Sequence, residues 1–332
     1  MVTAVATDAV ASGQTRGDAH EPNGRSLSRF TTVVLVGYLA FIAALMLLRR
    51  ATLSPEVFVV FAGVVAVMLG RGKAFVRDWA PFLLIFLAWQ LARSLADDIG
   101  ARVQSDSIIG VERFFSFGTV PSVEVQKALY VPGQISALDV AMTLVYLAHF
   151  LLPLLAAFLL WVFRRQLYYP YVMALLLLSF AQFATAVVLP VAPPRFAGMY
   201  GAALAVHDIS LNVTQALQLG TLSWAYQNLN GNPVAAFPSL HAAYPVIAFL
   251  FLRQAWPRAS WLMVGWAAVV VFAIVYLAHH YVIDAVGGIF YAVAAYWVVD
   301  RLRRAEWVVA TFARWRPRLL RRGAETTNQP SG

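Results

Sequence analysis

Long apolar runs, separated by short polar segments, dominate the pattern of hydrophobic positions along the chain. About eight of them approach the roughly 20 residues that a helix needs to cross the hydrocarbon core of a bilayer. Because lipid offers no partners to backbone N–H and C=O groups, segments of this length have to be helical. The expected spans cover residues 30–48, 55–70, 79–96, 138–163, 171–190, 239–256, 261–279 and 283–302. The pattern therefore predicts an all-α fold, a polytopic membrane helical bundle.

Two longer polar connections interrupt this series, at residues 97–137 and 191–237. They contain amphipathic stretches at 108–115 and 211–226, a pattern typical of short helices that lie on a membrane surface. Connections of this length within a compact bundle are usually functional. We therefore expect short surface helices in both connections.

Composition and charge agree with a membrane protein and set its expected orientation. The chain is 61% hydrophobic and 12% charged, whereas soluble domains carry roughly 25% charged residues. Its net charge is +9, and basic residues concentrate before the first span, after the last one, and between spans two and three, four and five, and six and seven. The positive-inside rule then predicts a cell-membrane protein with both termini in the cytoplasm and both long connections outside. No nucleic-acid partner is expected.

The ends of the chain and its lack of cysteine narrow the picture further. Residues 1–29 are polar and of mixed charge, so we expect a disordered tail without the pattern of a cleavable secretory signal. Residues 305–332 form a basic tail. The chain contains no cysteine, which excludes a disulfide framework and thiolate chemistry.

Four polar residues from separate parts of the chain fall at the outer ends of spans five to eight in this topology. Ionisable groups in a membrane bundle are rare and usually functional. The residues are Arg195, His241, His280 and Asp284. Their common depth predicts one site on the extracytoplasmic side.

His280 and Asp284 are spaced i, i+4, which places both on one face of a helix. A carboxylate there can accept a hydrogen bond from one ring nitrogen and leave the other as a nucleophile or base. A structural histidine bonded to a backbone carbonyl is the alternative interpretation of His280. The adjacent His279 points about 100° away on a helix, so we expect it to pack or to lie at the interface.

The start of span six and the segment before it add groups that suit a phosphate. Ser239 is a natural N-cap and a candidate phosphate neighbour, with capping alone as the alternative, and it places His241 in the first helical turn. A helix N-terminus offers unpaired N–H groups and partial positive charge. Arg195 follows two prolines, and its planar guanidinium suits a bidentate phosphate clamp, with a plain interfacial anchor as the alternative.

Two short motifs resemble a known family. Residues 235–243 (AAFPSLHAA) and 279–288 (HHYVIDAVGG) resemble the phosphatidic acid phosphatase type 2 superfamily, and more narrowly its inositol phosphorylceramide synthase (inositolphosphotransferase) branch with the bacterial relatives of that branch. Residues 189–195 (LPVAPPR) resemble this branch less specifically. The resemblance covers residues 79–304 and implies a six-helix core of phosphatase or phosphotransferase type. Residues 30–78 would then add two N-terminal transmembrane helices.

The resemblance also implies a mechanism that needs neither metal nor cofactor. By analogy, His280 attacks phosphorus and forms a phosphohistidine, while Asp284 orients its ring. His241 protonates the departing oxygen. Water, or the hydroxyl of an alcohol acceptor, then takes the phosphoryl group from a lipid phosphate or phospholipid substrate.

The chain departs from the wider superfamily in its phosphate clamp. Ala273 and Ile274 stand where the superfamily has a Ser-Arg pair, and no early Lys…Arg-Pro motif is present. Arg195 would supply one charge, and Arg93 or Arg113 another. These departures favour the synthase-like branch.

Other residues near the outer surface carry two interpretations each. Arg93 pairs at i+4 with Asp97, either as a structural bridge or as a headgroup contact. His149, with Tyr146, either reaches the substrate or forms a satisfied buried polar pair.

Several functions fit these observations. Headgroup transfer is the first, and a phosphatase acting on a lipid phosphate or polyprenyl diphosphate is the second, separated from it by whether an acceptor alcohol excludes water. A transporter is a third, although transporters place their sites near the midplane and carry repeats, neither of which this sequence shows. An inactive scaffold is disfavoured by the complete His/His/Asp set. The sequence makes no prediction of oligomeric state.

Overall fold

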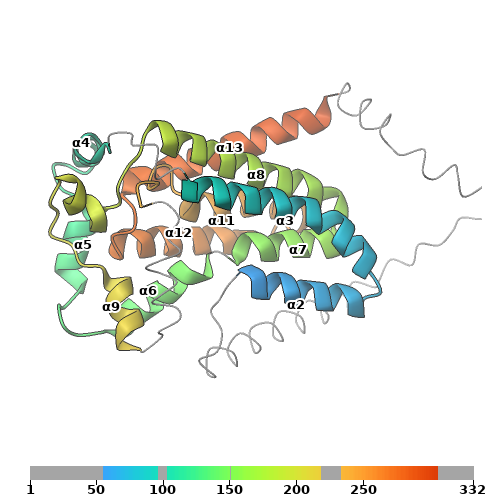
Figure 1. Cartoon of the computed structure of the whole chain (residues 1–332), viewed down its shortest axis with the longest axis horizontal. Coiled ribbons are helices and arrows are strands. Elements are labelled where there is room, and N and C mark those ends of the chain that lie inside the picture. Colours follow the sequence, from blue (N-terminus) through green and yellow to red (C-terminus); the bar gives the residue numbers. More distant parts are fainter. Residues whose placement is uncertain (1–54, 96–102, 150, 218–232, 306–332) are drawn as a thin grey trace, which may run out of the picture. The chain divides into compact units, whose positions relative to one another are not determined.

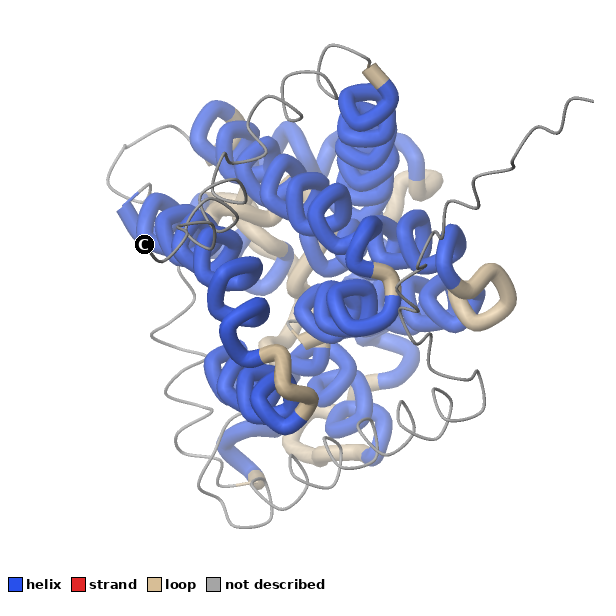
Figure 2. Tube along the Cα trace, turned by 90° about the vertical axis from the view of Figure 1, so that its right-hand side faces the viewer, coloured by secondary structure: helices blue, strands red, loops and turns tan. Residues whose placement is uncertain are grey.

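Helices build all of the fold that the structure describes. The computed structural model describes residues 55–95, 103–149, 151–217 and 233–305, and Figures 1 and 2 show these ranges as helices joined by loops. No strand occurs within them, only an isolated bridge between Val191 and Ala235. The predicted all-α class is therefore confirmed. The described residues belong to one compact unit, which begins at Arg49.

The helices follow the expected order along the chain (Figure 1). Their bounds are α2 Pro55–Met68, α3 Gly72–Leu95, α4 Ser105–Phe115, α5 Pro121–Leu129, α6 Ala137–Ala148, α7 Leu152–Phe163, α8 Arg165–Val188, the 3₁₀ helix η2 Pro194–Tyr200, α9 Ile209–Ala216, α11 Leu240–Ala255, α12 Trp261–Tyr276 and α13 Val282–Arg304.

Three helices are long and apolar enough to cross a bilayer. They are Gly72–Arg93 within α3, Arg165–Val188 and Val282–Arg304. Helices α6 and α7 make a fourth span if they are taken together, although they bend by 48° at their break. Phe58–Met68 and Trp261–Tyr276 are apolar but shorter. The chain is thus a multi-pass membrane protein, while the number of eight spans stays a prediction because residues 30–48 lie outside the described ranges.

The expected span at residues 138–163 is divided in two. α6 ends at Ala148, and α7 begins at Leu152 with Pro153 in its first turn. Proline has no N–H to donate, and it suits a helix start because the N–H groups there have no partner within the helix. The apolar pattern is continuous across this break, which is why the sequence alone predicts one helix.

α11 lies at the centre of the packing and contacts α7, α8, α12 and α13. Its interior face carries Ile247, Ala248 and Phe251, which are buried. α13 turns small residues toward the bundle, Gly288, Ala292 and Ala295, at helical spacing. Small residues let membrane helices approach closely, and this approach sets the distance between the starts of α11 and α13.

A buried carboxylate holds the N-terminal end of α8 in place. Asp78 at the start of α3 accepts a hydrogen bond of 2.9 Å from Trp161 Nε1 and pairs with Arg165. Arg71 donates to the carbonyl of Val162 over 3.1 Å. These contacts tie α3 to the junction of α7 and α8. They need no substrate to explain them.

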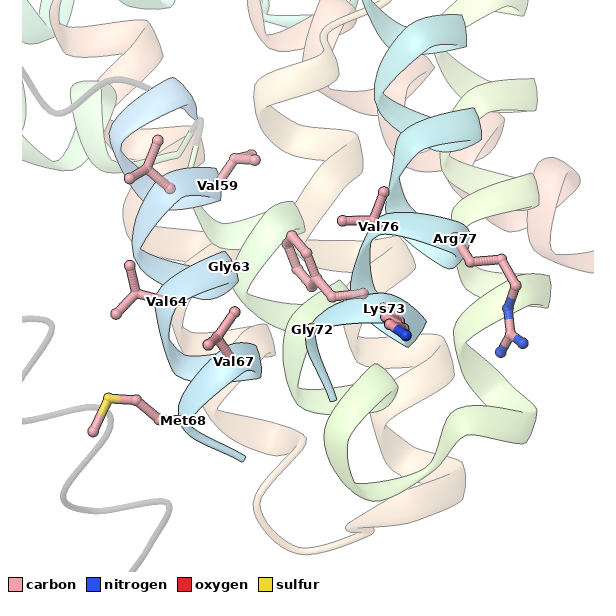
Figure 3. A pocket seen from close by; sticks show the side chains of 11 residues that line it. Val59, Gly63, Val64, Val67, Met68, Gly72, Lys73, Val76 and Arg77 are labelled. Carbon is pink, nitrogen blue, oxygen red and sulfur yellow. The ribbon is translucent and has the colours of Figure 1, made fainter. Parts of the chain in front are cut away.

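A cavity of about 1020 Å³ lies between α2 and α3. Figure 3 shows its valine-rich lining, with Lys73 and Arg77 among the lining side chains. None of the site residues predicted from the sequence lines it.

The two long connections form short helices, as expected. α4 contacts α13, α5 contacts α12, and α9 contacts α6. α9 begins two residues before the predicted helix, because Asp208 caps it by accepting a bond of 3.1 Å from the Leu211 N–H. Residues 218–226, which complete that predicted helix, lie outside the described ranges.

Other predictions fall partly or wholly outside the described residues. They concern the tails at 1–29 and 306–332, and residues 97–101. The division of the chain at residues 30, 79 and 305 stays a prediction, as does the cytoplasmic placement of both termini.

Candidate active site

The starts of α11 and α13 meet at one end of the bundle. The backbone N–H of Ser239 donates to the carbonyl of Asp284 over 2.9 Å. A Cβ on Gly288 would lie 2.1 Å from the Ser239 carbonyl oxygen, so only glycine permits this approach. Ser239 is the N-cap of α11, as predicted, and accepts from the Ala242 N–H at 3.5 Å. His241 therefore sits in the first turn beside the start of α13.

His280 links the two helix starts through its ring. Its Nδ1 lies 3.3 Å from Asp284 Oδ2, and its Nε2 lies 3.0 Å from His241 Nδ1. An ionised carboxylate can only accept, which assigns the proton to Nδ1 of His280 and leaves a lone pair on Nε2. Nδ1–H of His241 then donates to that lone pair. All three side chains that the sequence singled out for catalysis are thus in one hydrogen-bonded chain.

The expected contact between His280 and Asp284 forms, but for a different reason than the one predicted. α13 begins at Val282, so His280 precedes the helix and does not share a helical face with Asp284. Tyr281 is an extended N-cap, and its N–H donates to Asp284 Oδ2 over 2.9 Å. The carboxylate reaches back from the third helical position, which brings it to His280.

A tight turn after α12 presents the two adjacent histidines. The His279 N–H donates to the carbonyl of Ile274 over 2.8 Å, and the Ala278 N–H to that of Val275 over 3.1 Å. This is a Schellman pattern, and Ala278 takes the left-handed conformation (φ 57°) that glycine usually supplies. Ile274, at the position of the superfamily arginine, is fully buried in an apolar cluster.

Aromatic and imidazole rings stack behind His241. The ring of Tyr146 lies 4.8 Å from that of His241 and 4.0 Å from that of His279, while His149 lies 3.7 Å from His241. His149 Nδ1 is 2.6 Å from the Tyr146 carbonyl oxygen, so it donates there. His279 Nε2 contacts Ser210 Oγ at 2.9 Å. His149 is therefore a bonded buried group and also a direct neighbour of His241, and His279 is buried, as its packing interpretation expects.

Arg195 lies beside the histidine turn with its charge already paired. Its backbone N–H donates to the Ala278 carbonyl over 3.1 Å, and its side chain is 5% exposed. Nη1 lies 3.1 Å from Asp208 Oδ2, and the guanidinium stacks 4.2 Å from the centre of the Phe196 ring. Arg195 is thus at the predicted place, and Asp208 is a partner that the sequence did not reveal.

The other two predicted cations differ in position. Arg93 donates to Gln90 over 3.2 Å and acts electrostatically on His149 and His241. Asp97, its expected partner, lies outside the described residues. Arg113 is exposed on α4, and within the described part of the chain no hydrogen bond or ion pair joins it to the histidines.

Glu112 is a second residue that the sequence did not single out. Its carboxylate oxygens accept from the N–H groups of Val282 and Ile283 over 2.9 and 3.0 Å. Burial raises the pKa of Glu112, and the nearby charge of Asp284 also raises it. The signal was present in the sequence, because Glu112 follows Ser105, Ile108 and Ile109 on the buried face of α4.

Among the residues that the structure describes, no group of three or more His, Cys, Asp or Glu side chains is arranged to hold a metal ion. The chemistry that the described groups can perform is proton transfer and nucleophilic attack by imidazole. Charge stabilisation can come from Arg195 and the start of α11.

A histidine bonded to a carboxylate thus lies against a second histidine at one end of a membrane helical bundle. A family model described as the PAP2 superfamily matches residues 108–298. The chain belongs to this superfamily, and the resemblance drawn from its two histidine motifs is confirmed.

Two curated proteins are similar to part of the chain. The inositol phosphorylceramide synthase catalytic subunit of Schizosaccharomyces pombe is 30% identical over 131 residues, which cover 38% of this chain and 31% of that protein. The phosphoinositol dihydroceramide synthase of Bacteroides thetaiotaomicron is 29% identical over 141 residues, covering 38% of this chain and 43% of that protein. The chain thus spans less than half the length of each relative. No solved structure matches it.

Proposed function

We propose that this protein is a membrane phosphotransferase that moves a phospho-headgroup from a phospholipid donor to an alcohol acceptor. The observation that carries the proposal is the bonded chain from Asp284 through His280 to His241. The names of the two relatives, both inositol-type ceramide synthases, support transfer to an alcohol over hydrolysis. We place the reaction on the extracytoplasmic face, on the basis of the charge distribution.

The reaction proceeds in two displacements at phosphorus. Nε2 of His280 attacks, the bond between phosphorus and the lipid oxygen breaks, and His241, which enters this step as an imidazolium, gives a proton to that oxygen and becomes neutral. The phosphorylated imidazole carries positive charge, which the Asp284 carboxylate stabilises through Nδ1–H. The acceptor hydroxyl then attacks phosphorus while His241 takes its proton, and the bond to Nε2 breaks.

The geometry implies that donor binding separates the two imidazoles. Phosphorus and its oxygens cannot enter between nitrogens that lie 3.0 Å apart. Because the Asp284 carboxylate bonds the ring of His280, we expect the ring of His241 to be the one that moves. Its release frees Nε2 of His280, which the turn at Ile274 and the Asp284 carboxylate keep in place.

A donor panel tests the proposal with purified protein in detergent. Phospholipid donors are incubated with and without candidate alcohols, and we expect a new phosphodiester only when an alcohol is present. Release of phosphate or free phospho-headgroup at the same rate without alcohol would instead support the phosphatase alternative. His280→Asn should abolish both products.

The matched control for that variant is His207→Asn. His207 is exposed and lies outside the histidine cluster, with its ring against Tyr130. It should keep wild-type turnover. Substrate uptake that depends on His241 and His280 without any lipid turnover would favour a transporter and overturn the proposal.

A further inference from the structure

Glu112 fills the positive end of the helix that carries Asp284. Its side chain is buried, and its two oxygens accept from the first two N–H groups of α13, at Val282 and Ile283. These N–H groups have no partner within the helix itself. Asp284 accepts from the N–H of Tyr281, one residue earlier. Two carboxylates therefore accept hydrogen bonds from three consecutive N–H groups at the start of α13.

α4 is held firmly enough to place this carboxylate. Ile108 and Ile109 pack in a buried cluster with Val191, Ala236 and Tyr281. The Gln104 N–H, just before α4, donates to the Pro190 carbonyl over 2.9 Å. The same cluster thus contains residues from α4, from the segment after α8, and from the start of α13. Glu112 projects from this anchored face, whereas its neighbour Arg113 is exposed.

The contact has a structural consequence for the nucleophile. His280 precedes α13, so the orientation of its ring depends on the position of the Asp284 carboxylate. Asp284 lies in the first turn of α13, which Glu112 holds in place. Loss of an N-terminal acceptor destabilises a helix and permits its first turn to fray. Fraying at Val282 moves the Asp284 carboxylate away from Nδ1.

The contact has an electrostatic consequence as well. The transfer step makes His280 cationic, and an anionic neighbourhood favours that state. Asp284 supplies the nearest negative charge, and the Glu112 carboxylate adds a second one, since it bonds the two N–H groups that follow the one bonded by Asp284. Salt screens buried charges much less than exposed ones, so both carboxylates favour the cationic state of His280.

We propose that Glu112 is a positioning residue of the active site, which fixes the first turn of α13 and through Asp284 sets the orientation and charge of His280. This inference rests on the proposed function of His280. It assigns a task in the reaction to α4, through the bonds that Glu112 makes to the first turn of α13. Removing Glu112 should therefore slow the chemical step and leave donor binding intact.

Glu112→Gln is the first test, because glutamine keeps the volume but presents an NH₂ group to one of the two N–H donors and removes the charge. We expect kcat to fall about 10- to 100-fold, as for small misplacements of catalytic groups, with KM for the donor changed less than twofold. Glu112→Asp, which keeps charge and both oxygens, should recover part of the loss. Glu124→Gln is the matched control, since Glu124 is an exposed carboxylate on α5 paired with Lys127.

A double-mutant cycle separates positioning from general stabilisation. If Glu112 acts through Asp284, Glu112→Gln should have little further effect on the residual kcat of Asp284→Asn. Additive losses, or a lowered thermal midpoint with unchanged kcat, would show a merely structural role and overturn the inference.

Amide hydrogen exchange tests the same contact without any turnover. In Glu112→Gln the N–H groups of Val282 and Ile283 should exchange at least tenfold faster than in Glu124→Gln. Unchanged exchange would overturn the inference even if lipid transfer is found. Faster exchange in a protein that turns over no lipid phosphate would uphold the contact and instead contradict the proposed function.

Discussion

A methyl group on Gly288 should disable the site while leaving the fold largely intact. In Gly288→Ala the new Cβ would lie 2.1 Å from the Ser239 carbonyl oxygen, whereas ordinary contacts begin at 3.4 Å. The two backbones would have to separate by about 1.3 Å, the difference between those distances. Overpacking of this kind costs about 1–3 kcal/mol.

The two helices that would separate, α11 and α13, carry His241 and Asp284. The separation would stretch the 3.0 Å contact between His241 and His280 beyond hydrogen-bond reach. Misplacement by about 1 Å can cost roughly 100-fold in rate, so we expect kcat for headgroup transfer to fall about 100-fold. The assay is donor turnover by purified protein, with the thermal midpoint measured on the same sample.

Gly265→Ala provides the matched control. Gly265 lies within α12, and a Cβ there would meet nothing within 4 Å. Alanine is favoured over glycine in a helix interior by roughly 0.5–1 kcal/mol, so this variant should be as stable as wild type or more stable, with full activity. Wild-type turnover in Gly288→Ala would refute the claim that close approach of α11 and α13 builds the site.

Further predictions concern the proposed phosphate clamp at Arg195 and the orientation of the protein in the membrane. Asp208→Asn keeps an oxygen to cap α9 but removes the negative charge that pairs with Arg195. The guanidinium is then released for the donor phosphate, so KM for the donor should fall about three- to tenfold, as expected for about 1 kcal/mol. A KM that stays the same or rises would show that Arg195 binds no phosphate. The chain has no cysteine, which permits single-site labelling. Ser107→Cys on α4 should react with a membrane-impermeant maleimide in intact cells, and Lys73→Cys at the start of α3 only after permeabilisation; the reverse pattern would invert the proposed topology.

The sequence predicted the helices where hydrophobic length alone decides them. α8 and α13 are long and apolar; α13 lies within two residues of its expected bounds, whereas α8 begins six residues before its expected start. The break between α6 and α7 was not predicted, because the apolar pattern is continuous there and only the proline at the start of α7 marks it. Apolar periodicity reports which residues avoid water, and it does not report where a chain bends within the membrane.

The candidate site shows the same division. His241, His280 and Asp284 could be found from motif and spacing, yet the helical-face argument for the last two was wrong in its cause, since His280 stands before the helix. Glu112 and Asp208 were missed because their partners are set by tertiary contacts, with Glu112 lying 170 residues from Val282. The spacing of Glu112 from Ile108 and Ile109 marks it as part of the buried face of α4, but spacing does not reveal which groups the carboxylate meets there.

The central claim is that His280 becomes phosphorylated during turnover, and trapping the intermediate tests it most directly. Protein incubated with a donor labelled in its phosphorus is denatured in alkali, which preserves phosphohistidine, and then digested and sequenced by mass spectrometry. The account predicts label on His280, absent in His280→Asn and retained in His279→Asn. Turnover that proceeds with no label on this peptide, or with label on another residue, would contradict it.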